Sequence, residues 1–209
     1  MKHLSRPLRC FFGKKYILAC YNKHNIYKGW FCVTKTVEKD LIIIKDGVSF
    51  EISAMAVVVT MADKIPYFLV MRTFNHIYDF PKGHVKVNET YLEAAIRETE
   101  EEVGVVLSKE NLLTEIPGFS YQFNHDTLRI DLIEFHDRFK AFQVKKEIYA
   151  YLFIVDGFMP TIPNHDEDIE EVLWVKASEM NQVLSYKNSK DLVSRVMAFL
   201  NDHSFLGGE

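Results

Sequence analysis

Hydrophobic and polar positions alternate over short stretches in the first quarter of the chain, which is the pattern of β-strands with one buried face. It predicts strands at Phe31–Val37, Leu41–Lys45 and Val48–Ile52. Lys45-Asp46-Gly47 has the composition of a hairpin turn between the last two. Two longer apolar, β-branched runs follow at Ala54–Met61 and Tyr67–Met71. We expect them to be central strands of a mixed sheet, joined by a tight connection.

The spacing of apolar positions changes near residue 90. These positions then recur at helical intervals, at Leu92, Ala95, Ile96, Thr99 and Val103. Thr90 and Glu93 have the spacing of a capping box, and Gly104 stands where a helix C-cap is expected. The pattern therefore predicts a helix that begins after Thr90 and ends at Val103.

The second half of the chain alternates between strand-like and helix-like segments. Strands are expected at Phe119–Phe123, Ile148–Val155 and Val172–Val175, and helices at Ala177–Leu184 and Ser189–Asn201. This alternation favours an α/β fold around one sheet. A chain of 209 residues can bury one substantial core. We therefore expect one main domain over 53–209 and a β-rich N-terminal extension over 1–52.

The distribution of charge is uneven along the chain. Residues 1–52 carry ten Lys and Arg against four Asp and Glu, whereas the remainder carries fifteen against twenty-five. Basic residues that cluster would indicate a site for polyphosphate or nucleic acid. Here they are scattered among aromatic residues, which favours a solvated β surface, so that RNA remains an alternative partner rather than the expected one.

The sequence indicates a soluble protein of the cytoplasm. Cys10, Cys20 and Cys32 lack the paired spacing of zinc or redox sites, and we expect them to be small apolar side chains in a reducing compartment. No stretch approaches the roughly 18 apolar residues that a membrane-spanning helix needs. The first nine residues do not lead into a signal-peptide core either. We therefore expect no membrane partner.

Three glutamates of the predicted helix carry the candidate chemistry. Glu98, Glu101 and Glu102 lie at i, i+3 and i+4, so they share one face, opposite the apolar stripe. Their mutual repulsion raises carboxylate pKa values, and Mg²⁺ or Mn²⁺ would neutralise it. By itself, such a cluster is better explained as a solvated helix face. The choice between a metal site and a solvated face depends on the surrounding residues.

The surrounding residues favour the metal site. The segment from Gly83 to Val105 matches the spacing Gly-x5-Glu-x7-Arg-Glu-U-x-Glu-Glu-x-Gly-U, where U is usually apolar. The seven fixed positions are Gly83, Glu89, Arg97, Glu98, Glu101, Glu102 and Gly104. A chance match in a chain of this length is on the order of one in a million at average residue usage. The segment resembles the box of the Nudix hydrolase family, with Thr99 as a departure at the first U position.

The resemblance covers about residues 53–203 and implies an α/β/α sandwich with a mixed sheet, outside which the N-terminal extension lies. It implies that Glu98, Glu101 and Glu102 bind Mg²⁺ or Mn²⁺, with the backbone carbonyl of Lys82 as a further candidate ligand. Glu89 and Arg97 are implied to form the ion pair that holds the loop to the helix. The catalytic set implied by the resemblance is thus Glu89, Arg97, Glu98, Glu101 and Glu102.

The implied reaction is hydrolysis of a phosphoanhydride bond in a nucleotide-containing substrate. It builds charge on phosphate oxygens that metal ions can neutralise, and it needs no nucleophilic side chain. A general base is expected from a box glutamate or from a later loop. The acidic segment Asp166–Glu171 is the candidate source. A solvated loop explains the same residues equally well.

The residues at the start of the box narrow the range of expected substrates. Phe80–Val85 contains Pro-Lys-Gly-His and resembles the asymmetrical diadenosine tetraphosphate hydrolases. Lys82 and His84 are then candidate phosphate-binding residues, and Tyr121 and Phe123 candidate platforms for base stacking. Each has a structural alternative: Lys82 as an exposed loop residue, His84 as a packing residue, and the two aromatics as core.

Other features indicate different substrates. The β-rich extension resembles the N-terminal strands of ADP-ribose pyrophosphatases, which build dimers, so a homodimer through residues 1–52 is expected as one arrangement. The proline that the ADP-ribose group carries about sixteen residues after the box is absent, and Tyr121 or its neighbour stands there. We therefore favour a dinucleoside polyphosphate. The alternatives are ADP-ribose or a nucleotide sugar, RNA 5′ ends, and a non-catalytic nucleotide sensor.

Overall fold

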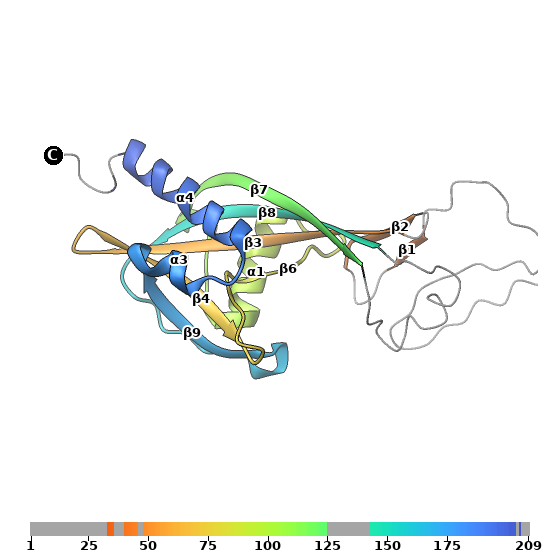
Figure 1. The fold of residues 1–209 in the computed structure, drawn as a ribbon, viewed down its shortest axis with the longest axis horizontal. Helices are drawn as coiled ribbons and strands as arrows, with labels where there is room; N and C mark the ends of the chain where they lie inside the picture. Colours follow the sequence, from red (N-terminus) through yellow and green to blue (C-terminus); the bar gives the residue numbers. More distant parts are fainter. Residues whose placement is uncertain (1–32, 36–39, 46–47, 125–142, 204, 206–209) are drawn as a thin grey trace, which may run out of the picture. The chain divides into compact units, whose positions relative to one another are not determined.

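The computed structural model describes residues 33–35, 40–45, 48–124, 143–203 and 205 of the chain. Within these residues nine strands form one sheet with helices packed against it (Figure 1). The strands are β1 (Val33–Lys35), β2 (Ile42–Lys45), β3 (Val48–Ala62), β4 (Ile65–Thr73), β5 (Tyr78–Asp79), β6 (Lys82–His84), β7 (Leu112–Asn124), β8 (Gln143–Val155) and β9 (Ile169–Lys176). The helices are α1 (Tyr91–Val103), α3 (Met180–Val183) and α4 (Lys187–Asp202), with 3₁₀ turns η1 (Lys109–Asn111), η3 (His165–Glu167) and η4 (Ala177–Glu179).

The chain divides into two compact units. The smaller unit contains Met1–Ile52, Lys86–Asn88 and Tyr121–Lys146, and the larger one contains Ser53–Val85, Glu89–Ser120 and Glu147–Glu209. The helix with the glutamate cluster and the C-terminal helices belong to the larger unit. Three long strands, β3, β7 and β8, begin in one unit and end in the other.

The two central strands form a hairpin with a two-residue turn. β3 and β4 pair antiparallel up to Ala62 opposite Ile65. Asp63 and Lys64 between them have φ values of 50° and 63°. Two consecutive positive φ angles are typical of the tight hairpin turn that matches the twist of the strands. The prediction of two central strands with a tight connection is confirmed, although β3 is a single strand where we expected two.

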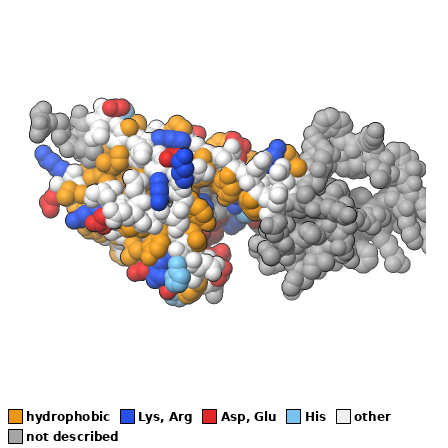
Figure 2. All heavy atoms as spheres, viewed as in Figure 1, with side chains coloured by type: hydrophobic (Ala, Val, Ile, Leu, Met, Phe, Trp, Pro, Cys, Tyr) orange, Lys and Arg blue, Asp and Glu red, His pale blue; other side chains and the backbone are white. Residues whose placement is uncertain are grey.

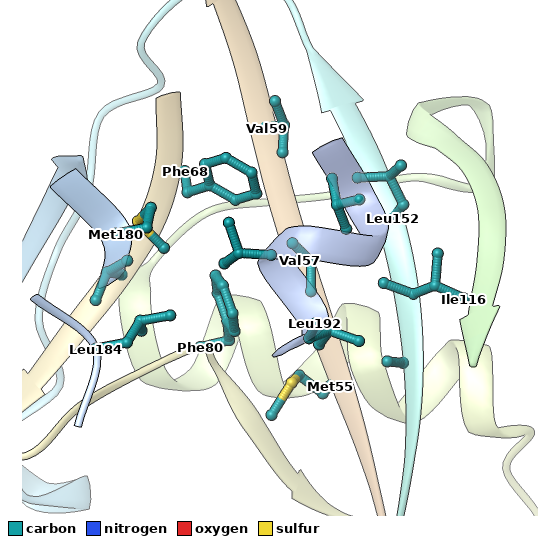
Figure 3. Packing of buried hydrophobic residues seen from close by; sticks show 14 of the residues in the cluster. Met55, Val57, Val59, Phe68, Phe80, Ile116, Leu152, Met180, Leu184 and Leu192 are labelled. Carbon is teal, nitrogen blue, oxygen red and sulfur yellow. The ribbon is translucent and has the colours of Figure 1, made fainter. Parts of the chain in front are cut away.

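Helices cover both faces of the central sheet, as expected for an α/β/α sandwich (Figure 1). Alternate residues of β3, Met55, Val57 and Val59, belong to the hydrophobic cluster that also contains Leu192 and Val196 of α4 (Figure 3). Ala54, Ala56 and Val58 are also fully buried, and they point to the opposite face, because side chains alternate along a strand. This arrangement explains why the strand reads as an uninterrupted apolar run.

Both caps predicted for the box helix are present in α1. The Thr90 hydroxyl accepts a hydrogen bond from the Glu93 N–H at 3.2 Å, and the Glu93 carboxylate accepts one from the Thr90 N–H at 2.9 Å. Gly104 ends the helix in the left-handed region with φ 72°, and a Cβ there would press on Ile162. Thr99 is buried and donates its hydroxyl to the Ala95 carbonyl at 2.7 Å. The departure from the apolar pattern is therefore accommodated.

The described part of the N-terminal extension is a three-stranded antiparallel arrangement. β1 pairs with β2, and β2 pairs with β3 so that Lys45 lies opposite Val48, as a hairpin requires. The strand expected at Phe31–Val37 is described at Val33–Lys35, and the rest of it lies outside the described residues. Cys10, Cys20 and Cys32 also lie outside them. The Ile52 to Ser53 junction falls within β3.

We expect deletion of residues 1–52 to cause aggregation or loss of activity. The cut severs β3 and removes Glu51, whose carboxylate lies 4.0 Å from the Lys146 ammonium of β8. An exposed strand remnant without its neighbour is prone to pair with other chains. Size-exclusion chromatography and thermal unfolding of fragment 53–209 measure the effect. Fragment 48–209, which keeps β3 whole, is the matched control and should aggregate less. A monomeric, fully active fragment 53–209 would contradict the prediction.

The C-terminal elements differ slightly from those expected. Ala177–Leu184 was predicted as one helix, but it consists of the η4 turn and the short helix α3. α4 begins at Lys187, two residues before the predicted start. Within the described part of the chain, no helix combines the length and hydropathy needed to cross a bilayer. On the face that Figure 2 shows, basic, acidic and hydrophobic side chains of the larger unit are interspersed.

Candidate functional site

Arg97 of α1 is the centre of the site. Its Nε donates to one carboxylate oxygen of Glu89 at 3.0 Å, and its Nη2 donates to the other at 2.7 Å. Nη2 also donates to the His84 carbonyl at 3.0 Å. Burial by itself would lower the Arg97 pKa, but the hydrogen bonds to Glu89 and Glu98 raise it overall, so the guanidinium stays charged. The loop from β6 to α1 is therefore tied to the helix through one arginine.

Glu98 and Glu101 lie on the other side of the same guanidinium. Arg97 Nη1 donates to Glu98 Oε1 at 2.6 Å and to Glu101 Oε2 at 2.8 Å. The Glu98 side chain is 14% exposed and that of Glu101 45%. A Cβ at Gly83 would overlap the Glu98 carboxylate. A side chain at position 83 would therefore displace the Glu98 carboxylate, which gives a reason for glycine at the first fixed position of the box.

Glu102 is partly buried, in contrast to the exposed helix face that the spacing suggested. Its carboxylate accepts the Lys82 N–H at 2.8 Å. Burial raises the pKa of Glu102 to about 8, and the charges of Glu98 and Glu167 add to this effect. The Lys82 ammonium and its N–H act in the opposite direction. The negative charge on Glu102 is thus costly, and a cation beside it would reduce that cost.

The donor set of the box fits a divalent metal ion by its chemistry. Carboxylate oxygens are the ligands that Mg²⁺ and Mn²⁺ prefer, and Glu98, Glu101 and Glu102 supply them from adjacent turns of one helix. Two of these carboxylates face Arg97. Within the described residues, no three acidic, histidine or cysteine side chains converge as a formed metal site. The assignment of Glu98, Glu101, Glu102 and the Lys82 carbonyl as ligands stays a prediction.

The acidic segment beyond the box is anchored at the C-terminal end of α1. Asn164 donates from its side chain to the Glu101 carbonyl at 2.8 Å and from its backbone to the Glu102 carbonyl at 3.0 Å. These bonds satisfy carbonyls that the helix leaves unpaired at its end. Glu167 of η3 is exposed, and its charge contributes to the raised Glu102 pKa. Glu167 is thus brought toward the box.

The carboxylates of Glu170 and Glu171 pair with Arg72 instead. The Arg72 guanidinium lies 2.9 Å from Glu170 and 3.0 Å from Glu171. Asp168 has φ 62°, and its carbonyl accepts the Phe74 N–H at 3.1 Å. The side chain of Asp166 lies outside the described residues. Of the described carboxylates in this segment, Glu167 is therefore the best candidate to act at the site.

The four predicted substrate-binding residues are divided between the units. Lys82 and His84 lie on β6 in the larger unit, where the Lys82 ammonium is 2.9 Å from Asp79 and His84 is half-buried opposite Ser53. Tyr121 and Phe123 belong to the smaller unit, on β7. Their rings stack with centroids 6.0 Å apart and are 37% and 41% exposed. They are therefore surface aromatics rather than core residues.

Asp79 is a site residue that the sequence analysis missed. It is 3% exposed at the end of β5. Its carboxylate accepts the Ser189 hydroxyl at 2.6 Å and the Phe80 N–H at 2.9 Å, in addition to its pair with Lys82. The available signal was one acidic residue in the aromatic run from Tyr78 to Phe80. Its partner Ser189 is far away in the sequence, so spacing could not reveal the pair.

The fold and the site together define an α/β/α sandwich in which one capped helix carries an Arg-Glu box against a glycine-containing strand. Residues 50–196 match the model of the NUDIX domain. The match covers more than half of the chain, and the chain therefore belongs to the NUDIX family. The family resemblance deduced from Gly83 to Val105 and the expected fold class are confirmed.

Two curated relatives share sequence with the chain. It is 28% identical over 116 residues to the putative mutator protein MutT4 of Mycobacterium tuberculosis (strain CDC 1551 / Oshkosh), a match that covers 56% of this chain. It is 40% identical over 60 residues to the asymmetrical bis(5′-nucleosyl)-tetraphosphatase of Sus scrofa, covering 28% of this chain. The chain spans 39% of the length of each relative.

The fold is also similar to solved structures. An Ap4A hydrolase binary complex from C. elegans superposes with a TM-score of 0.53 at 21% identity, over 73% of this chain and 98% of that one. The Nudix hydrolase RenU from M. smegmatis superposes with a TM-score of 0.50 at 14% identity, over 73% and 86%. At these identities the similarity shows the fold.

Proposed function

We propose that the protein is a metal-dependent hydrolase that cleaves a phosphoanhydride bond in a nucleotide-containing substrate, with a dinucleoside polyphosphate as the preferred substrate. One observation carries the proposal. Three box carboxylates lie in the C-terminal half of α1, two of them are bonded to Arg97, and desolvation makes the charge of the third, Glu102, costly. Divalent cations stabilise a cluster of carboxylates of this kind. Hydrolysis of a polyphosphate also requires cations that neutralise the charge on the phosphate oxygens.

Each residue of the site has a separate proposed role. Glu98, Glu101 and Glu102 would hold Mg²⁺ or Mn²⁺, with the Lys82 carbonyl as a further ligand. Divalent cations there would neutralise charge on phosphate oxygens and lower the pKa of an attacking water. Arg97 and Glu89 tie the loop from β6 to α1 to the helix. Because Gly83 has no side chain, the Glu98 carboxylate can lie against the strand.

Glu167 is the proposed general base. It is exposed, so water and substrate can reach it, and its charge acts on Glu102. The bonds from Asn164 to the end of α1 hold η3 beside the box. A base must lie within hydrogen-bond reach of the attacking water in the bound complex. A carboxylate anchored next to the ligands, but not itself paired with Arg72, suits that role.

The preference for a long phosphate chain is supported by the start of the box. Lys82 and His84 flank Gly83 on β6. The similarity to the asymmetrical bis(5′-nucleosyl)-tetraphosphatase is consistent with such a substrate. A chain of four phosphates carries more negative charge than the two of ADP-ribose, so it gains more from a lysine and from bound cations. Tyr121 and Phe123 are the proposed stacking platforms for a base, as exposed stacked rings.

We expect a higher kcat/KM for diadenosine tetraphosphate than for ADP-ribose, by about ten-fold or more, because one extra base–aromatic contact contributes about 1–3 kcal/mol. Lys82→Ala and His84→Ala should reduce this ratio. Lys176→Ala, an exposed lysine at the end of β9, is the matched control and should leave it unchanged. Steady-state kinetics with Mg²⁺ measure the ratio. A wild-type preference for ADP-ribose would exclude the proposed substrate, and an unchanged ratio in both variants would remove these side chains from the explanation.

The same panel separates the alternatives. Turnover of ADP-ribose, nucleotide sugars or 5′-triphosphorylated RNA in place of diadenosine tetraphosphate identifies a different substrate class. Binding of nucleotides without turnover identifies a sensor. The proposed homodimer through the extension over 1–52 is tested by the molecular mass of the full chain in size-exclusion chromatography with light scattering.

A further inference from the structure

Asp79 is buried and acidic, and it is not one of the fixed positions of the box. Three donors surround its carboxylate: the Phe80 N–H, the Ser189 hydroxyl and the Lys82 ammonium. The Asp79 side chain is 5% exposed and that of Lys82 22%. A buried carboxylate is tolerated when it is paired and hydrogen-bonded, and removal of one partner is costly. The Asp79 carboxylate therefore has the Lys82 ammonium as its ionic partner, and the Ser189 hydroxyl of α4 donates a further hydrogen bond to it.

Lys82 connects this cluster to the box. Its N–H donates to Glu102 at 2.8 Å, while its ammonium lies 2.9 Å from Asp79. The pairing of β6 with β3, with Met55 opposite Lys82, fixes the backbone at this point. One residue thus contacts a box carboxylate with its backbone and a buried carboxylate with its side chain. The ammonium pairs with Asp79, and its charge also acts on Glu102.

The support of Asp79 comes from α4. Ser189 lies in the first turns of that helix and is 1% exposed. Just before the helix, Ser185 accepts the Tyr78 N–H at 2.9 Å with its hydroxyl and donates its own N–H to the Tyr78 carbonyl at 3.0 Å. Three hydrogen bonds, two with Ser185 and one with Ser189, therefore join Tyr78 and Asp79 to the segment that leads into α4.

We propose that Asp79, supported by Ser189, is a positioning residue that holds the Lys82 ammonium beside the box and keeps it from pairing with Glu102. The inference rests on the proposed function, because it concerns how Glu102 stays available to a cation. Without the Asp79 charge, the ammonium is drawn toward the box carboxylates, where it neutralises them in place of a metal ion. Asp79→Asn has nearly the same shape and can still accept from Ser189 and Phe80, so it removes the charge and little else.

The first test needs no metal. In proton–nitrogen correlation spectra tuned to lysine ammonium groups, a paired and part-buried ammonium exchanges slowly and is visible, and Lys82→Arg assigns the Lys82 signal. We expect Asp79→Asn to shift or broaden this signal and Ser189→Ala to shift it less. Ser194→Ala, an exposed serine of the same helix, is the control and should leave it unchanged. An unchanged Lys82 signal in Asp79→Asn would overturn the proposal.

The second test measures Mn²⁺ binding to the full chain by electron paramagnetic resonance of free Mn²⁺. We expect Asp79→Asn to weaken binding about ten-fold, the scale of a lost second contact around a metal site. Adding Lys82→Met should restore the affinity, because the displaced ammonium is gone. A loss that Lys82→Met does not restore would show that Asp79 only supports the fold, and would overturn the proposal. Absence of Mn²⁺ binding by the wild type would contradict the proposed function instead, and the ammonium spectra would still decide the role of Asp79.

Discussion

We expect Glu102→Gln to lower kcat/KM at least about 100-fold, because loss of the proposed metal ligand would remove several kcal/mol of charge stabilisation from the transition state. The fold should remain intact. The amide oxygen can still accept the Lys82 N–H that the carboxylate accepts at 2.8 Å, and the variant removes a charge that burial disfavours. In thermal unfolding of the metal-free proteins, the Tm of the variant should therefore lie within a few degrees of the wild-type Tm or above it.

Three glutamine variants distinguish a ligand from a base. Glu102→Gln should weaken Mn²⁺ binding as well as turnover. Glu167→Gln should lower turnover and leave Mn²⁺ binding close to that of the wild type, because Glu167 acts from η3 rather than from α1. Glu100→Gln, on the exposed side of the same helix, is the control and should change neither. Turnover of Glu102→Gln within a few-fold of the wild type at saturating Mg²⁺ would remove this residue from the ligand set.

Arg97→Ala should reduce both stability and activity. The change removes the donors to Glu89 and to the His84 carbonyl and leaves Glu98 and Glu101 without the guanidinium between them. Loss of one partner from a part-buried ionic cluster costs about 3 kcal/mol, because the remaining charges stay desolvated. Urea unfolding measures the loss of stability, and steady-state kinetics measure the loss of activity.

A double-mutant cycle with Glu89→Ala tests whether the two residues act as a pair. Their bidentate contact, with distances of 3.0 Å and 2.7 Å, predicts a coupling energy above about 1 kcal/mol. Arg195→Ala, which removes an arginine bonded to the carbonyls of Pro117 and Gly118, is the matched control and should be additive with Glu89→Ala. Strictly additive losses for Arg97→Ala and Glu89→Ala would show that the loop is not held through this pair.

The local features of the box helix could be predicted from the sequence. Capping depends on residues a few positions apart, so Thr90, Glu93 and Gly104 were sufficient to place both ends of α1. The same holds for the ion pair of Glu89 and Arg97, which the family resemblance implied and which the structure contains. The apolar runs of β3 and β4 were recognisable because both of their faces are buried.

The partial burial of Glu102 and the contacts of Asp79 could not be predicted from spacing. Helical periodicity places Glu98, Glu101 and Glu102 on one face, but it does not show that β6 covers part of that face. β5 and β6 themselves are two and three residues long, too short to leave a periodic signal. Ser189 lies on a helix more than a hundred residues from its partner Asp79. Such contacts are set by the tertiary fold.

The space at Gly83 has a consequence for interpreting natural variation. Among the described glycines, Gly104 and Gly157 have positive φ, and Gly83 does not, so its backbone conformation is open to any residue. Alanine at this position would cause no strain in the backbone, but its methyl group would occupy the place of the Glu98 carboxylate. A paralogue with that single replacement would keep every acidic residue of the box. A survey that classifies genes as active from the box glutamates alone would therefore misassign this paralogue. The residue at position 83 should be considered as well, because it determines whether the Glu98 carboxylate has space.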